Sequence, residues 1–238
     1  MKRKRKSSGI IIIGNEILSG KTLDTNSNYI CKELFKIGIY CEEICVIKDN
    51  ITKIISKVKE FKVQFDYVFT SGGIGPTHDD ITSQAIAEAF GRKLLLNKEA
   101  KNRLEKHYSD DVLTNARLKM AYLPEQAILI DNPVSVAPGF YIENVYVLPG
   151  VPSILEIMLK DIVRLIDEGD RFFKKTISTI LSEGIIGDYV ENVQKKFTDL
   201  EIGSYPYFKK NNFGVSLIIR GVDEKRVKLA ALEIFDYI

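Results

Sequence analysis

The sequence predicts a doubly wound α/β domain with a mostly parallel sheet, followed by a small α+β domain. Apolar strand-like runs alternate with amphipathic helical patterns through the first 170 residues. This alternation, with short connections, is typical of a parallel sheet with helices on both faces. The run Ile10–Ile13 is entirely β-branched, as expected for a strand buried on both faces. A charged break, "DEGDR" at 167–171, precedes a second and shorter series of elements.

The elements of the larger domain follow from apolar spacing and from end signals. Asp24, Thr25 and Asn26 offer N-caps for a helix that Gly38 ends. Pro152 occupies the first turn of another predicted helix. We expect strands at 10–13, 39–47, 65–70, 127–130, 139–142 and 145–150, and helices at 24–38, 51–61, 79–91 and 151–167. Residues 97–122 are polar with helical spacing, and they are predicted to form a peripheral excursion.

The smaller domain is predicted as a βαββα unit. We expect strands near 174–181, 201–205 and 215–219, and helices near 188–197 and from Asp223. The predicted organisation is a basic disordered tail at 1–9, an α/β domain at 10–170 and the small domain at 171–238.

Charge gives no case for a nucleic-acid partner. The chain has 238 residues, and its 34 lysines and arginines nearly balance 32 acidic residues for a net charge of +2. The basic run "MKRKRK" at 1–6 is predicted to be a solvated tail; a localisation signal or a contact with an anionic surface is the alternative.

Membrane, disulfide and histidine-rich metal sites are not expected. No segment approaches the ~18 uncharged apolar residues of a membrane span. Cys31, Cys41 and Cys45 are odd in number and lack a CxxC pair, so they fit neither a disulfide framework nor a zinc knuckle. The chain has two histidines. We therefore expect a cytoplasmic protein in a reducing environment.

The stretch "FTSGGIGPTHDDIT", Phe69 to Thr82, combines glycines with two adjacent carboxylates. It lies between a predicted strand and a predicted helix, where open α/β sheets bind ligands at helix N-termini. Glycines let the backbone approach a guest closely, and threonines add hydroxyl donors. The candidate phosphate ligands are Gly72, Gly73, Gly75, Thr77 and Thr82.

Asp79 and Asp80 would repel a phosphate unless a cation lay between them. Magnesium prefers one or two carboxylates together with phosphate oxygens and water. The loop therefore predicts a site for a divalent cation, such as Mg, Mn or Co. The alternative is a glycine-rich turn in which one of the two aspartates caps the next helix.

Further loops are expected to reach the same edge of the sheet. Asp49, in "VIKDN", is a candidate catalytic residue or an N-cap for the helix from Ile51. Glu16 and Asp24, in "GNEILSGKTLDTN", are candidate acidic ligands or turn and cap residues. The loop Asp131–Phe140, with Gly139, is a candidate ligand wall; irregular surface structure is the alternative. Gly150 in "LPGVP" makes room for a ligand at the same edge.

These motifs together resemble the molybdopterin-binding-like domain family. The motifs are "GNEILSGKTLDTN", "VIKDN", "SGGIGPTHDDIT", "NPVSVAPGF" and "VYVLPGVP", in the family's order over about 150 residues. The likeness is to the amino-terminal domain of CinA proteins and of eukaryotic FAD synthases. The segment "IGSYPYFKKNNFGVSLIIRG" resembles the small domain that follows in those proteins.

The resemblance implies metal-dependent hydrolysis of a nucleotide pyrophosphate such as ADP-ribose or FAD. Carried over to this sequence, it implies that Asp49 and Asp80 form the catalytic acidic pair and that the loop residues Gly72, Gly73, Gly75 and Thr77 hold phosphate. Asp79 belongs to the local motif only; with Asp80 and Glu16 it is a candidate metal ligand from the residues themselves. Position 15 is Asn, where the family usually has Asp before Glu16. This departure implies a weakened metal site or an inactive copy. Since the sequence contains no amidase-like or nucleotidyltransferase domain, neither deamidation nor FAD synthesis is expected.

Three functions remain open from the sequence. The first is the pyrophosphate hydrolase, the second a molybdopterin adenylyltransferase of molybdenum cofactor synthesis, and the third a non-catalytic binder. The expected partner is a small nucleotide or pterin ligand, with no nucleic acid and no membrane. Because family members commonly self-associate, a homo-oligomer is expected.

Overall fold

The computed structural model describes residues 6–108, 113–209 and 212–238. The chain divides into two compact units, Met1–Gly169 and Asp170–Ile238, each with a sheet of its own.

The larger unit is built on a six-stranded sheet with the order β2-β1-β3-β8-β7-β6. Its strands are β1 (Lys6–Ile13), β2 (Ile39–Ile47), β3 (Tyr67–Ser71), β6 (Ile128–Ile130), β7 (Gly139–Ile142) and β8 (Val145–Leu148). The strands β2, β1, β3 and β8 run parallel, whereas β7 and β6 pair antiparallel. The predicted doubly wound, mostly parallel sheet is confirmed.

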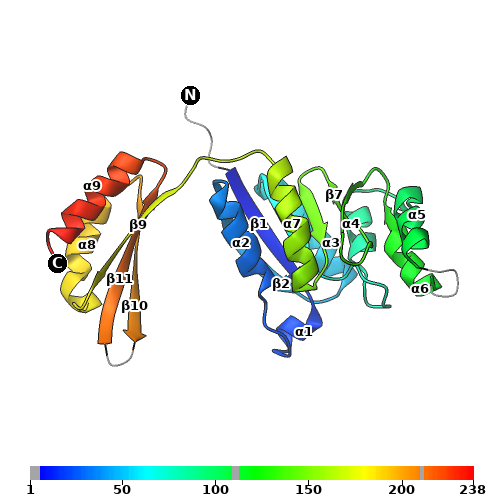
Figure 1. Cartoon of the computed structure of the whole chain (residues 1–238), viewed down its shortest axis with the longest axis horizontal. Helices are drawn as coiled ribbons and strands as arrows, with labels where there is room; N and C mark the ends of the chain where they lie inside the picture. The colour runs from blue at the N-terminus through cyan, green and yellow to red at the C-terminus, as the bar shows by residue number, and fades with distance from the viewer. Residues whose placement is uncertain (1–5, 109–112, 210–211) are drawn as a thin grey trace. The chain divides into compact units, whose positions relative to one another are not determined.

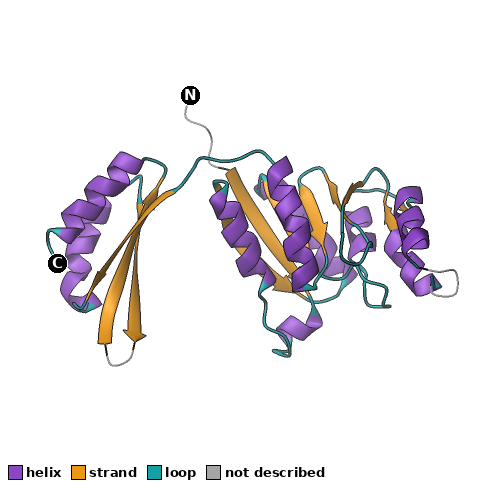
Figure 2. Cartoon of the chain, in the orientation of Figure 1, coloured by secondary structure: helices purple, strands orange, loops and turns teal. Residues whose placement is uncertain are grey.

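Helices cover both faces of this sheet (Figures 1 and 2). One face packs against α2 (Asn26–Lys36) and α7 (Pro152–Leu165), and the other against α3 (Ile51–Gln64) and α4 (Thr82–Ala89). In β1, Ile10 and Ile12 belong to the first core, and Ile11 and Ile13 to the second. The continuous β-branched run is explained by this double burial, which contributes about 1.5–3 kcal/mol per isoleucine.

The amino-terminal end of β1 corrects one prediction. A tail was predicted at 1–9, but β1 begins at Lys6. Ser8 is fully buried, and its hydroxyl donates to the carbonyl oxygen of Tyr40 at 3.2 Å. The backbone N–H and the hydroxyl of Ser7 both donate to Asp66 Oδ2. Pairing with two neighbouring strands therefore orders Lys6–Gly9, while the rest of the predicted tail lies outside the described residues.

The predicted excursion between α4 and the second half of the sheet is a small layer of its own. It contains β4 (Leu94–Leu96), α5 (Lys98–His107), α6 (Asn115–Leu118), the short 3₁₀ helix η1 (Lys119–Ala121) and β5 (Tyr122–Pro124). The strands β4 and β5 form a separate antiparallel pair. Asn97 and Thr114 cap α5 and α6 by accepting backbone N–H groups of the first turns.

The smaller unit has the predicted βαββα order. Its elements are β9 (Phe173–Thr179), α8 (Glu183–Lys196), β10 (Glu201–Lys209), β11 (Asn212–Gly221) and α9 (Glu224–Phe235). The antiparallel sheet has the order β10-β11-β9, and α8 and α9 share one hydrophobic core with it. Pro206 lies in β10, an edge strand, where a missing N–H group is tolerated.

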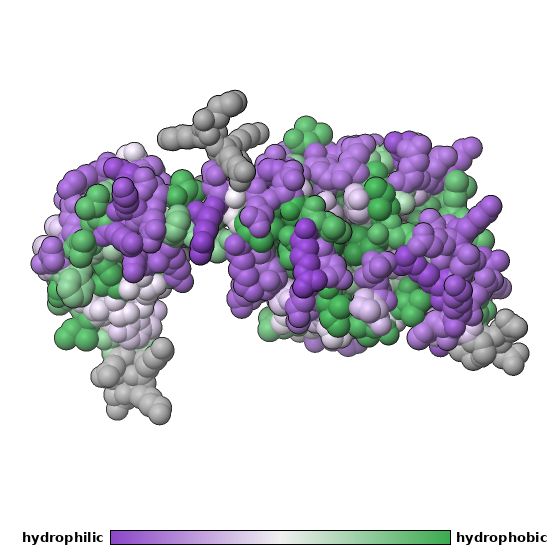
Figure 3. Space-filling view, turned by 45° about the horizontal axis from the view of Figure 1, so that its top comes forward, coloured by the Kyte–Doolittle hydropathy of each residue, from purple (hydrophilic) through white to green (hydrophobic). Residues whose placement is uncertain are grey.

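The surface is mixed in character. On the larger unit, Figure 3 shows hydrophilic side chains on most of the visible face, with hydrophobic ones between them. In the part of the chain that the structure describes, no helix has the length and apolar character needed to cross a membrane.

Candidate functional site

A cavity of about 560 Å³ lies at the carboxyl ends of the parallel strands, and we call it the main cavity. Ile13 ends β1, Gly72 follows β3, Asp49 follows β2 and Pro149 follows β8, and all four residues line it. The chain leaves β1 toward the face with α2 and leaves β3 toward the face with α4. The cavity therefore lies at the point where the winding of the sheet reverses, the usual ligand position in open α/β folds.

The glycines of the loop after β3 are required by the packing of the loop itself. Gly72 and Gly73 have φ values of +110° and +71°, which side chains rarely adopt. A Cβ atom at Gly72 would overlap the carbonyl oxygen of Ile13, and one at Gly73 would overlap the Thr82 hydroxyl. The loop is thus held close against the end of β1 and the start of α4.

Two predicted ligand residues lie behind the wall of the cavity. Thr82 is fully buried, its hydroxyl donates to Gly72 O at 2.9 Å, and its N–H donates to Gly73 O at 2.9 Å. Gly139 is buried in β7, where a Cβ atom would press on Val147 and Met158. Neither residue lines the main cavity, so both support its walls.

Three consecutive residues that line the main cavity have backbone N–H groups without a partner in the described part of the chain. The N–H groups of Gly73, Ile74 and Gly75 donate to no acceptor within the described ranges. Successive backbone N–H groups in a turn can form a concave cluster of donors that binds phosphate oxygens. These three residues are half-buried. A phosphate group here would supply the acceptors that the protein does not.

Thr77 holds the two aspartates of the loop. Its N–H donates to Asp80 Oδ2 at 2.8 Å, and its hydroxyl oxygen lies 2.5 Å from both Asp79 Oδ1 and Asp80 Oδ2. A hydroxyl has one proton and can satisfy only one of these oxygens. The Thr77 hydroxyl bond, followed by a backbone hydrogen bond, holds the pKa of Asp79 below its usual range. Thr77 can therefore hold one oxygen of each carboxylate, with its N–H on Asp80 and its hydroxyl on Asp79, while Asp80 Oδ1 has no hydrogen-bond donor among the described residues.

Glu16 and Asp49 approach the main cavity from the ends of β1 and β2. The Glu16 carboxylate lies against Gly14, where a side chain would occupy the same space. Asp49 Oδ2 accepts the backbone N–H of Asn15 at 2.8 Å. The cap of α3 is Asn50, which accepts the N–H of Lys53, so Asp49 is not the helix cap. Asp49 instead fastens the start of α1 (Asn15–Leu18).

Asp24, the other acidic candidate, serves the start of α2. Its Oδ1 accepts the N–H of Ser27 at 3.1 Å, and its Oδ2 accepts the Ser27 hydroxyl. Asp24 does not line the main cavity.

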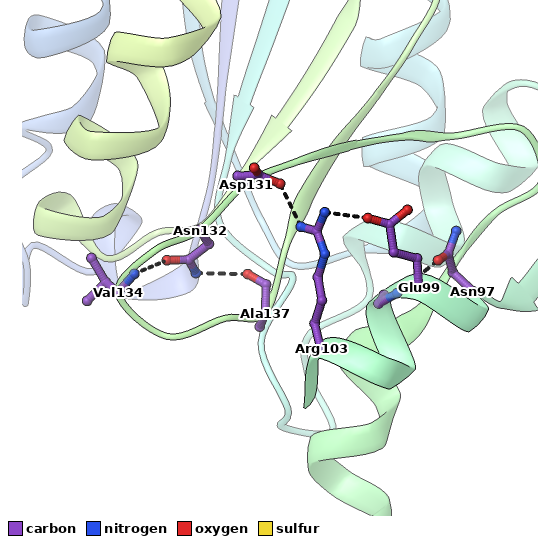
Figure 4. A network of polar contacts seen from close by, with 8 residues as sticks. Asn97, Glu99, Arg103, Asp131, Asn132, Val134 and Ala137 are labelled. Carbon is purple, nitrogen blue, oxygen red and sulfur yellow. Dashed lines mark hydrogen bonds and ion pairs between the residues drawn. The ribbon is translucent and has the colours of Figure 1, made fainter. Parts of the chain in front are cut away.

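The opposite wall is the loop 131–138, which Asn132 organises (Figure 4). Asn132 is 6% exposed. Its side-chain amide donates to Ser135 Oγ at 2.7 Å and to Ala137 O at 2.8 Å. Its side-chain carbonyl accepts the N–H groups of Val134 and Ser135. Arg103 of α5 joins Glu99 to Asp131 and so ties this loop to the excursion (Figure 4).

A strained residue lies within the same loop. Val136 has a φ of +67°, and the Ala137 N–H donates to Ser135 O at 2.7 Å, which closes a γ-turn around it. A β-branched residue in this conformation is an outlier, with a cost of roughly 1–3 kcal/mol. The bonds made by Asn132 hold the turn in place.

The structure brings most predicted site residues together and adds others. Those that line the main cavity are Glu16, Asp49, Gly72, Gly73, Gly75, Thr77, Asp79, Asp80 and Gly150. Thr22, Asn132 and Ser135 also line it; they lie in loops that were predicted to reach this edge but were not singled out, whereas Met120 lies in the excursion, which was not. The Asn-Pro turn signal at 132–133 could have indicated Asn132, whereas nothing in the local sequence marks Met120.

The donor set fits a divalent cation that shares its coordination with a ligand. Among the residues that the structure describes, no three His, Cys, Asp or Glu side chains form a preassembled metal site. Magnesium needs only one or two carboxylates when phosphate oxygens and water complete its shell. Asp79 and Asp80, two carboxylates that line the same cavity, meet that requirement.

Comparison with known protein families supports the family resemblance seen in the sequence motifs. Residues 9–168 match the family described as a probable molybdopterin binding domain. The chain belongs to this family. Residues 171–238 match a second family, the middle domain of FAD synthase. The resemblance inferred from the motifs is confirmed for both parts of the chain.

Relatives of this family span the chain to different extents. A protein from Archaeoglobus fulgidus is 36% identical over 221 residues, or 93% of each chain. A probable FAD synthase from Caenorhabditis briggsae is 35% identical over 91% of this chain, which spans 46% of that protein. A CinA-like protein from Thermosipho melanesiensis is 29% identical over 98% of this chain and 60% of its own length. The chain thus spans about half of the nematode protein.

A solved structure supports the fold of the larger unit. The crystal structure of CinA from Thermoplasma acidophilum, a protein of unknown function, is 36% identical in sequence. It covers 68% of this chain and 99% of its own, with a TM-score of 0.64.

Proposed function

We propose that the chain is a metal-dependent hydrolase of a nucleotide pyrophosphate, of the ADP-ribose or FAD type. One observation carries the proposal: Gly73–Gly75, whose N–H groups have no partner among the described residues, line the same cavity as Asp79 and Asp80. The N–H groups could bind phosphate oxygens, but the neighbouring aspartates would repel a phosphate. A divalent cation bound together with the ligand would remove this repulsion. The relatives named FAD synthase support a nucleotide as the substrate class.

The remaining walls suit the rest of such a ligand. Met120, Val151 and Ile154 line the main cavity as apolar groups, away from the carboxylates in sequence. A volume of about 560 Å³ falls within the roughly 300–1,000 Å³ of cavities that bury small ligands. The flat ring of a nucleotide could pack against these apolar side chains while its phosphates bind the loop Gly72–Asp80.

The chemistry assigns roles to the chain's own residues. The reaction adds water to one phosphorus and breaks its bond to the bridging oxygen, which leaves with the second phosphate. A bound divalent cation would supply charge neutralisation for the phosphate oxygens. The N–H groups of Gly73–Gly75 would hold those oxygens, and Asp79, Asp80 and Glu16 would hold the cation. Asp49 keeps Oδ1 free while Oδ2 binds Asn15, so it can orient water and accept its proton.

The test is product analysis with ADP-ribose, with FAD, and with molybdopterin plus ATP, each with magnesium, manganese or cobalt and with a chelator. Release of AMP from ADP-ribose or FAD, dependent on the metal, is the expected result. Adenylylated molybdopterin would instead identify a transferase. Binding without any product would identify a binder and contradict the proposal.

A further inference from the structure

A second, smaller cavity lies behind the loop that carries the aspartates. Its volume is about 140 Å³, and it shares Ile74, Gly75 and Asp80 with the main cavity. This is below the roughly 300 Å³ at which cavities bury a whole small-molecule ligand, so it suits a single small group. Its other lining side chains include His78, Lys119 and Tyr122.

Lys119 brings a positive charge to an otherwise acidic site. The main cavity is lined by four carboxylates, those of Glu16, Asp49, Asp79 and Asp80, and by no lysine, arginine or histidine of the described ranges. Lys119 lies in η1, next to Met120, so this short helix contributes one residue to each cavity. The excursion from β4 to β5 therefore supplies a cation that the parallel sheet does not.

The lysine is held in place but has donors to spare. Its Nζ donates to the carbonyl oxygen of Thr77, the residue that clamps both aspartates. An ammonium group has three N–H donors, and Lys119 forms no ion pair with a carboxylate in the part of the chain that the structure describes. The side chain is half-buried, which strengthens its interaction with a charged guest.

We propose that the smaller cavity is a phosphate subsite in which Lys119 binds one phosphate group of a pyrophosphate ligand. His78, Ser83, Gln84 and Tyr122 add potential donors around the same space. Asp80 lies between the two cavities, with its Oδ2 turned to Thr77. A cation on the aspartates would remove their repulsion and leave the charge of Lys119 to attract the phosphate. This inference rests on the proposed function but is tested without turnover.

The probe is methylenediphosphonate, a pyrophosphate analogue that cannot be hydrolysed, titrated calorimetrically in the presence of magnesium. Lys119→Met should weaken its binding about tenfold or more, since hydrogen bonds to charged groups are the stronger class. Lys119→Arg should stay within about threefold of the unchanged protein, because it keeps the charge and the donors. Lys101→Met is the matched control: Lys101 lies in the same excursion and pairs with Glu105 on α5, so binding should not change.

Lys119→Gln separates ligand binding from support of the loop. It keeps a neutral donor for Thr77 O but loses the charge, so binding should remain weak while the melting temperature is kept. Recovery of binding in Lys119→Gln, or unchanged binding in Lys119→Met, would overturn the subsite, as would absence of binding to the unchanged protein. If instead the analogue binds through Lys119 but ADP-ribose and FAD are not cleaved, the proposed hydrolysis fails and the subsite stands.

Discussion

The two walls of the main cavity differ in how their polar groups are used. Within the described residues, the wall from Gly72 to Asp80 keeps unused capacity: the N–H groups of Gly73–Gly75 donate to no acceptor, and Asp80 Oδ1 accepts no hydrogen bond. In the wall at 131–138, the side chain of Asn132 donates twice and accepts twice within its own loop. The first wall has groups available for a ligand, whereas the polar groups of Asn132 in the second are used within the protein.

Burial follows the same division. Asp79 is exposed and Asp80 is half-buried, whereas Asn132 is almost fully buried. Unused donors and acceptors are tolerated at a solvent-accessible wall, where water can satisfy them until a ligand binds. A buried amide must be satisfied by the protein. Substitutions in the first wall should therefore affect function, and those in the second should affect stability.

The largest expected effect is on the first wall, with Asp80→Asn. Turnover should fall by at least ~100-fold, about 2.7 kcal/mol, because a carboxylate for the cation is lost. Asn can still accept the Thr77 N–H through its carbonyl oxygen, so the melting temperature should be kept. Steady-state hydrolysis and thermal unfolding measure the two effects. Asp161→Asn, on the surface of α7, is the control, and near-normal turnover in Asp80→Asn would remove Asp80 from the site.

The second wall should respond to Asn132→Ala through stability. Loss of the buried amide leaves Ala137 O and two backbone N–H groups without partners, at a cost of about 2 kcal/mol in the free energy of unfolding. Urea unfolding measures it. The exposed Asn102→Ala on α5 should be close to neutral. Equal stabilities of the two variants would show that the loop does not depend on Asn132.

A smaller effect of opposite sign is expected at Val136. Glycine adopts positive φ without strain, so Val136→Gly should raise the free energy of unfolding by about 1 kcal/mol after the entropy cost of glycine is subtracted. Val134→Gly, at an ordinary backbone position in the same loop, should lower it by roughly 0.5–1 kcal/mol. Urea unfolding of both variants measures the two free energies of unfolding. If both fall by the same amount, Val136 is not strained.

The smallest effect is expected at Asn15, where the chain departs from its family's pattern. Its backbone N–H binds Asp49, while its side chain is exposed and does not line the main cavity. Asn15→Asp should therefore change the metal concentration for half-maximal hydrolysis by less than about threefold, or roughly 0.7 kcal/mol. A tenfold decrease in the half-activating metal concentration would instead show that the side chain at position 15 reaches the cation. The Asn at this position would then weaken the metal site.

The sequence by itself predicted the sheet and most of the loops that line the main cavity. Ile10–Ile13 had to be a strand buried on both faces, because a continuous β-branched run suits no half-exposed strand. Once the strands were parallel, the loops at Asp49, Gly72 and Gly150 had to meet at one edge. Local spacing was sufficient, since these groups follow their strands directly in the chain.

Only the tertiary structure decided the features that depend on contacts between distant segments. Ser8 becomes part of β1 through pairing with Cys41 and Tyr67 and through its hydroxyl bond to the carbonyl oxygen of Tyr40, all more than 30 residues away. Thr82 was predicted to face a ligand, but packing turned its hydroxyl to Gly72. Lys119 reaches Thr77 across 42 residues, from an excursion whose polar helical pattern gave no sign of a binding role. Periodicity states which face of an element is buried, but the atom that a polar side chain meets depends on how the elements pack.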